Sequence, residues 1–187
     1  MGEDVVTVVK SSSDYNTMEL TDENTFTDTI KMDLGRVIVI YMGRRDAINV
    51  YFEPGAVVNI DYDTETGIDS TGITGADESI VAYLKAKDDV PSSMDDDYVA
   101  FYSWEEADFI AGIDTVENAQ LALIESSTLP ENFASYARHM VEFSKINQLN
   151  EYSDYHGYFT EKEGFKVSAD FEKAVPTVDM DNDAYAK

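Results

Sequence analysis

The acidic residues at positions 179–183 are spaced like the start of a calcium-binding loop. Asp179, Asp181 and Asp183 alternate with other residues, and alternating carboxylates supply the first oxygen ligands of a helix-loop-helix calcium site. The pattern then fails, because Ala184 stands where the loop needs glycine and the sequence ends before the closing glutamate. We expect no metal site here, but a helix start with carboxylates near the positive end of the helix dipole.

Nucleophilic and acid–base chemistry require residues that this sequence does not group together. The chain contains no cysteine, so it has no thiol nucleophile, no thiolate zinc site and no disulfide. Nothing near His139 or His156 in the sequence suggests a triad or a metal set, and we expect packing or surface roles for both. No Gly-x-Ser-x-Gly elbow and no phosphate-binding glycine loop is present. We therefore expect no enzyme, with no catalytic, cofactor-binding or metal-binding residue and no cofactor.

Two groups of aromatic residues are the remaining candidates for ligand binding. They are Tyr98, Phe101, Tyr102 and Trp104 in one group, and Tyr152, Tyr155, Tyr158 and Phe159 in the other. Exposed aromatic side chains can line a groove for a sugar or a peptide. Aromatic residues at helical spacing more often form a core or an interface between domains. We expect the core or interface, and the binding groove remains the alternative.

The charge of the chain excludes two classes of partner. Against 38 Asp and Glu there are 13 Lys and Arg, which gives a formal net charge of -25. Nucleic acids and anionic membrane surfaces would be repelled. No apolar run approaches the roughly 18 to 20 residues of a membrane span, and residues 1–4 lack the features of a signal peptide. Solubility or a saline medium is the ordinary explanation for such acidity.

The elements that must position these residues change character along the chain. Apolar residues alternate on both sides of Pro54-Gly55, a pair that predicts a type II turn. We expect strands at 5–9, 17–20, 25–32, 36–41, 47–52, 57–62 and 68–73. Short strands at this spacing predict an antiparallel β-sandwich over residues 3–75.

From Asp77 onwards, apolar residues recur at helical spacing. We expect helices that begin near residues 77, 98, 104 and 116, and a longer one from Pro130 to 149–152. Residues 88–97 form an acidic linker. The expected fold class is α+β, with the sandwich followed by an α-helical segment over residues 76–187.

Several stretches resemble, in order, the N-terminal region of TlpA-like thioredoxin-family disulfide reductases of Gram-negative bacteria. In the first half they are 26–30, 50–63 around Pro54-Gly55, 73–76 and Ala82-Tyr83-Leu84. In the second half they are 97–103, 129–133 and 178–185, which resemble the helical segment that links the sandwich to the thioredoxin domain.

The resemblance implies a secreted protein, either periplasmic or a lipoprotein tethered to the outer membrane. A thioredoxin-like domain with a Trp-Cys-x-x-Cys motif would follow residues 76–187, and the full-length protein would then be a thiol-disulfide oxidoreductase. This chain lacks that motif, so no catalytic residue can be transferred to it. We expect a non-catalytic accessory region that positions the redox domain or binds its client. The alternatives are a free-standing surface module that binds glycan or peptide, and a hydrolase whose site the sequence does not reveal.

Overall fold

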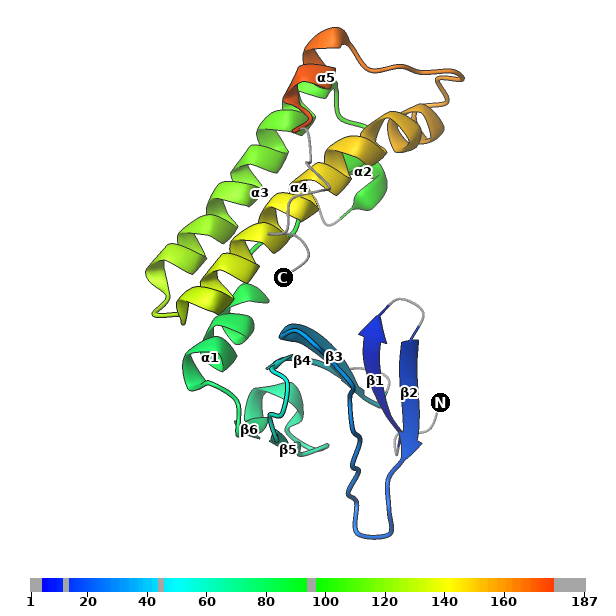
Figure 1. The fold of residues 1–187 in the computed structure, drawn as a ribbon. Coiled ribbons are helices and arrows are strands. Elements are labelled where there is room, and N and C mark those ends of the chain that lie inside the picture. The colour runs from blue at the N-terminus through cyan, green and yellow to red at the C-terminus, as the bar shows by residue number, and fades with distance from the viewer. Residues whose placement is uncertain (1–4, 12–13, 44–45, 94–96, 177–187) are drawn as a thin grey trace. The chain divides into compact units, whose positions relative to one another are not determined.

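The computed structural model describes residues 5–11, 14–43, 46–93 and 97–176. The chain divides into two compact units, Met1–Lys85 and Ala86–Lys187. Figure 1 shows antiparallel strands in the first unit and long helices in the second. The expected α+β class is therefore confirmed.

The first unit contains a four-stranded antiparallel sheet. Its strands are β1 (Val5–Ser11), β2 (Asp14–Glu19), β3 (Arg36–Met42) and β4 (Asp46–Phe52), in the order β2-β1-β3-β4. Alternate residues of the three strands β1, β3 and β4 bury their side chains in one cluster: Val6, Val8, Ile38, Ile40, Ile48 and Val50. The pairs Val8↔Ile40 and Ile40↔Ile48 lie in register across these strands. This is the period of two on which the prediction of half-buried strands depended.

A second sheet contains only β5 (Asn59–Asp61) and β6 (Gly72–Thr74), with a 3-10 helix η1 (Gly67–Ser70) between them. Ile60 and Ile73 pair in this sheet, and both pack against the apolar cluster of the larger sheet. The two sheets are separate and do not close on each other, so the predicted β-sandwich is not confirmed.

The turn at Pro54-Gly55 has the expected geometry. Gly55 has a φ of 83°, and the amide of Ala56 donates to the carbonyl of Glu53 at 3.0 Å. Both features are typical of a type II turn. The strands on its two sides do not pair with each other, because β4 joins the larger sheet and β5 the smaller one.

Two predicted strands of this unit are wrong in part. Residues 25–32 form no ladder, although Phe26, Ile30 and Met32 still pack against the apolar cluster. The strand expected at 68–73 is divided between η1 and the short β6. Of the two apolar residues at 68–73, Ile73 contacts the core and Ile68 is exposed. In both segments most of the backbone has no neighbouring strand to pair with.

The hydrogen bond between Tyr62 and Asp46 makes the stability of this unit sensitive to high pH. The Tyr62 hydroxyl donates to Asp46 Oδ2 at 2.6 Å, and this bond to a carboxylate raises the pKa of Tyr62 to about 12. An ordinary tyrosine has a pKa near 10, so the contribution is complete below pH 10 and is lost as pH rises through about 12. We expect the difference in unfolding free energy between the wild type and Tyr62→Phe to shrink over that interval. Urea unfolding at pH 8, 10 and 11.5 measures it, and a difference that grows with pH would contradict the assignment.

Helix α1 (Glu78–Lys87) lies almost entirely in the first unit. Asp77 caps it, because the Asp77 carboxylate accepts hydrogen bonds from the amides of Ser79 at 2.9 Å and Ile80 at 3.3 Å. The side-chain hydrogen bond from Ser79 is the main reason that the pKa of Asp77 is lowered. At the other end, Lys85 Nζ donates to the carbonyl of Thr71 at 3.1 Å.

The described part of the second unit contains four helices: α2 (Tyr98–Tyr102), α3 (Glu106–Ser126), α4 (Glu131–Phe159) and α5 (Ala169–Ala174). The two helices expected near 104 and 116 are one continuous helix, α3. Helix α4 extends to Phe159, past the expected end at 149–152, and Pro130 is its N-cap and not its first residue. Helix α5 was not predicted. No helix within the described ranges is both long and apolar enough to cross a membrane.

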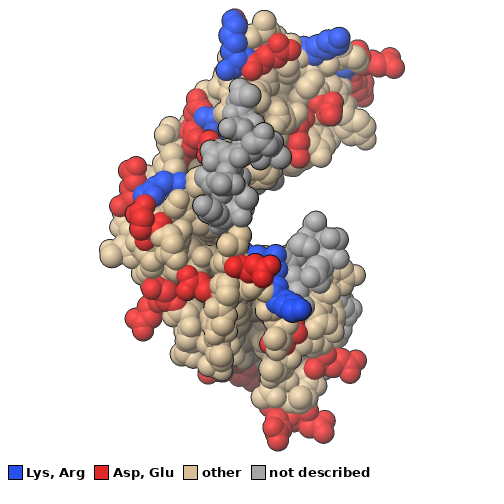
Figure 2. All heavy atoms as spheres, viewed as in Figure 1, with Lys and Arg blue, Asp and Glu red and all other residues tan. Residues whose placement is uncertain are grey.

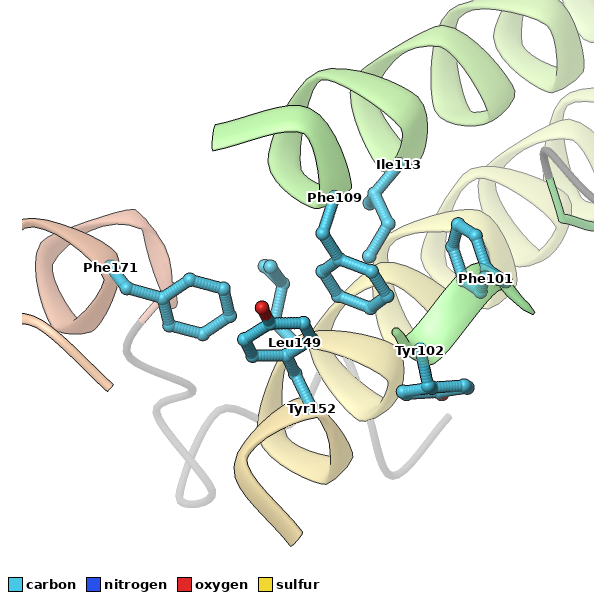
Figure 3. Close-up of a cluster of buried hydrophobic side chains, with 7 residues drawn as sticks. All are labelled: Phe101, Tyr102, Phe109, Ile113, Leu149, Tyr152 and Phe171. Carbon is cyan, nitrogen blue, oxygen red and sulfur yellow. The ribbon is translucent and has the colours of Figure 1, made fainter. Parts of the chain in front are cut away.

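Helices α3 and α4 run side by side, and α2 and α5 cover one end of the pair (Figure 1). Seven buried side chains from all four helices meet there (Figure 3): Phe101, Tyr102, Phe109, Ile113, Leu149, Tyr152 and Phe171. Further along the pair, Lys145 of α4 donates to Asp114 Oδ1 and Glu117 Oε2 of α3, both at 2.7 Å. The core at this end of the unit is therefore mainly aromatic, and an ion-pair network joins the two long helices.

Candidate functional site

The metal and catalytic candidates do not form a site in the described part of the chain. Residues 179–183 lie outside the described residues. His139 is half-buried on α4, and His156 is fully buried, also on α4. No three His, Asp or Glu side chains are grouped as a metal ion would require, as far as the structure describes the chain.

The aromatic candidates separate into a buried set and a surface set. Phe101, Tyr102 and Tyr152 belong to the core, as expected for aromatic residues at helical spacing, and Trp104 packs against it. The hydroxyl of Tyr152 donates to the carbonyl of Trp104 at 2.7 Å, so this buried phenol has a partner. The three core residues stabilise the fold and are not available to a ligand, whereas Trp104 is only partly buried.

The surface set forms an aromatic patch, which we define as Tyr98, Val99, Tyr155, Tyr158 and Phe159. Tyr98 is 47% exposed and Tyr158 is 78% exposed. The ring of Tyr98 meets the ring of Tyr155 edge to face, with 5.3 Å between centroids. The Phe159 ring lies 5.8 Å from Tyr155 and 5.3 Å from Tyr158. Tyr155 and Phe159 are partly buried and also pack against the apolar core, so the exposed part of the patch is Tyr98, Val99 and Tyr158. Exposed aromatic rings of this kind are candidates for contact with a ligand.

Local structure explains why these rings come together. Tyr158 and Phe159 follow Tyr155 by three and four residues on α4, so both lie beside it on the helix surface. Tyr98 comes from the start of α2, where the Asp97 side chain accepts hydrogen bonds from the amides of Val99 at 2.9 Å and Ala100 at 3.2 Å. Burial, and then the hydrogen bond with Tyr155, raises the pKa of Tyr98 to about 12. Near neutral pH its phenol is therefore uncharged.

An open pocket of about 420 Å³ adjoins the patch at the end of α4. Its lining includes Asp154, Tyr158, Glu161, Lys162, Glu163 and Phe165. The chain reverses direction here, because the amide of Lys162 donates back to the carbonyl of Gly157 at 3.0 Å. Glu161 adopts the left-handed conformation that this reversal requires, with a φ of 55°. Glycine is the usual residue at that position.

His156 lies buried beside this pocket, and both of its ring nitrogens are engaged. Nδ1 is 3.0 Å from the carbonyl oxygen of Tyr102, and Nε2 is 3.0 Å from Lys162 Nζ. A carbonyl only accepts and an ammonium only donates, so His156 is the neutral tautomer with its proton on Nδ1. An imidazole held in this way is placed to fix the turn after α4, not to take a proton from a substrate.

Unlike the carboxylates around the pocket, the ammonium of Lys162 interacts with other side chains. Besides donating to His156, its ammonium lies 3.6 Å from Glu105 Oε1. Among the described residues, the side chains of Asp154, Glu161 and Glu163 make no hydrogen bond or ion pair. Within the described ranges, the pocket therefore presents three carboxylates without a partner and one ammonium that already has partners. This arrangement can bind a ligand but contains no nucleophile in contact with a base.

Sequence reasoning grouped the aromatic residues but missed the role of His156 and the pocket. A usable signal was present, because His156 follows Tyr152 by four residues and Leu149 by seven, so the three share one helix face.

Comparison with known proteins identifies no relative. No family model, no curated protein and no solved structure matches the chain.

Proposed function

We propose that this chain is a non-catalytic accessory region of a secreted, TlpA-like thioredoxin-family protein, periplasmic or anchored to the outer membrane as a lipoprotein. It acts by protein contact, and positions a redox domain or binds that domain's client. The observation that carries the proposal is the order of parts: strands first, helices second, with the resembling stretches in sequence along both. As part of the proposal, the two sheets form an open β-sandwich, since Ile60 and Ile73 share the core of the larger sheet.

The aromatic patch supports a contact role. Protein interfaces are enriched in tyrosine, and two tyrosines of the patch are substantially exposed. Figure 2 shows Asp and Glu side chains spread over the visible surface of each unit, with fewer Lys and Arg. A surface of this kind favours partners that are neutral or basic.

The reading frame that follows the codon of Lys187 tests the proposal directly. A Trp-Cys-x-x-Cys motif within a thioredoxin-like domain is the expected result. A stop codon at that point, or a domain of another class, would remove the basis for the accessory role.

The accessory role also predicts that this chain is redox-silent. Thiol-disulfide exchange needs a thiolate to attack, and the chain has no cysteine. We expect insulin reduction by dithiothreitol to proceed at the same rate with and without this protein. Bovine serum albumin with blocked thiols serves as the protein control, and a clear acceleration over it would contradict the prediction.

A free-standing module that binds glycan is the second candidate, favoured by the exposure of Tyr158 beside an open pocket. Sugars stack on aromatic faces, and their hydroxyls can donate hydrogen bonds to carboxylates such as those that line this pocket. Binding of a neutral oligosaccharide that is lost in Tyr158→Ala would support this candidate over the accessory role.

A further inference from the structure

We propose that the aromatic patch and the adjoining pocket bind a basic, arginine-containing segment of a partner protein. The inference rests on the proposed protein-binding function and names the chemistry of its partner. It concerns only the end of α4, the turn that follows it and the start of α2, all within the second unit.

Charge complementarity is the first argument for a cationic occupant. Asp154, Glu161 and Glu163 line the pocket, and none has a partner among the described residues. The ammonium of Lys162 does not neutralise them, because it donates to His156 Nε2 at 3.0 Å and lies 3.6 Å from Glu105. A guanidinium can satisfy a carboxylate with two parallel hydrogen bonds, which an ammonium cannot do.

The aromatic patch supplies the second argument. Tyr158 is 78% exposed and also lines the pocket, so its ring is accessible to a cation that binds the carboxylates. Guanidinium groups stack on aromatic faces and are the cations most often found there. Tyr98 and Val99, which are 47% and 48% exposed, extend the apolar surface for the residues next to the arginine.

Other occupants fit these side chains less well. An anionic ligand would meet three carboxylates and a protein of net charge -25. A neutral glycan would find a ring on which to stack, but it would leave the charge of the carboxylates uncompensated. The volume of about 420 Å³ leaves room for a long side chain such as that of arginine.

The test uses the full chain and two synthetic peptides at 0.15 M NaCl. One is acetyl-Gly-Arg-Leu-Arg-Gly-amide, and the other carries citrulline, which has the shape of arginine without its charge. Calorimetry or fluorescence polarisation should show saturable binding of the arginine peptide only. We expect Asp154→Asn with Glu163→Gln to weaken it about tenfold, and Tyr158→Ala about fivefold.

The matched control is Asp22→Asn with Glu23→Gln, which removes two exposed carboxylates from the first unit and changes the net charge equally. We expect less than a twofold change in affinity for this variant. An equal loss of affinity for the arginine peptide in both double variants would overturn the proposal, because the peptide would then be attracted by the overall negative charge and not by the pocket. Equal binding of the citrulline peptide, or binding of neither peptide, would also overturn it.

Glu161→Gly separates binding from folding. Glycine suits the left-handed backbone at this position, so the variant should be at least as stable as the wild type while it loses one carboxylate. We expect the arginine peptide to bind it about threefold more weakly. If a folded Glu161→Gly variant bound the arginine peptide with unchanged affinity, the pocket would not be part of the binding site.

The outcomes distinguish this inference from the proposed function. A thioredoxin-like domain after Lys187, together with no peptide binding, would overturn the inference alone. Peptide binding with no such domain would overturn the accessory role and leave a basic-segment binding site.

Discussion

Replacing Phe109 by alanine will lower the free energy of unfolding of the helical unit by about 3–5 kcal/mol. The Phe109 side chain is completely buried, and its ring centroid lies 4.3 Å from that of Tyr152 and 4.7 Å from that of Phe101. It thus joins α2, α3 and α4 at one point, as Figure 3 shows. Truncation leaves a cavity among rigid rings, which cannot collapse to fill it as flexible aliphatic side chains would.

The single tryptophan provides the measurement. Trp104 packs against this core, so its fluorescence during urea unfolding follows the second unit. Phe143→Ala is the matched control, because Phe143 is 44% exposed on α4 and should cost only a few tenths of a kcal/mol. Similar midpoints for the two variants would contradict the assignment of Phe109 to the centre of the core.

Much of the first unit could be predicted because the strands bury one face. Ile38, Ile40, Ile48 and Val50 alternate with less buried residues, and this alternation by itself gives both the strand and the face that it buries. Alternation does not reveal which backbone pairs with which. Residues 25–32 contact the core through Phe26 and Ile30 but have no ladder, because contact with a core does not supply a strand neighbour.

The helices show a different limit of prediction from sequence, which concerns where a helix ends. A break was expected between Ile113 and Val116, where Asp114 and Thr115 interrupt the apolar pattern. In the structure, Asp114 pairs with Lys145 of α4 and the Thr115 hydroxyl donates to the carbonyl of Ala111 at 2.8 Å, so the helix continues. The Asp114 pair is a contact between residues 31 positions apart, which a local pattern cannot contain.

Helix α5 was missed because it is short and depends on a distant partner. Ser168 caps it by accepting a hydrogen bond from the amide of Phe171 at 3.2 Å. The amide of Ser168 in turn donates to Glu106 Oε1 of α3 at 2.7 Å. Six residues would not hold a helix alone, and the fixed cap together with the burial of Phe171 stabilises it.

The candidate site was only half visible in the sequence. Tyr152 and Tyr158 belong to the same aromatic run, but six residues on a helix separate them by roughly 240° of rotation. Tyr152 therefore enters the core while Tyr158 faces solvent. The spacing in the sequence is enough to show that Tyr152 and Tyr158 lie on different sides of α4. It does not show which side is buried, because that depends on packing against α3, which no local pattern specifies.

Removing His156 will destabilise the helical unit far more than removing Lys162, although the two side chains share a hydrogen bond. We expect His156→Ala to lower the free energy of unfolding by about 2–5 kcal/mol. The substitution leaves a cavity and removes the hydrogen-bond donor of the Tyr102 carbonyl, to which Nδ1 donates at 3.0 Å. The Lys162 side chain is 46% exposed, so in Lys162→Met water can replace the ammonium, and we expect a loss below about 1 kcal/mol.

Two measurements decide this prediction. Urea unfolding followed by Trp104 fluorescence gives the two costs, and equal costs would mean that the ammonium, and not the buried carbonyl, dominates the network. Long-range ¹H–¹⁵N spectra of the imidazole give the tautomer directly, and a proton on Nε2 would contradict the geometry of both hydrogen bonds.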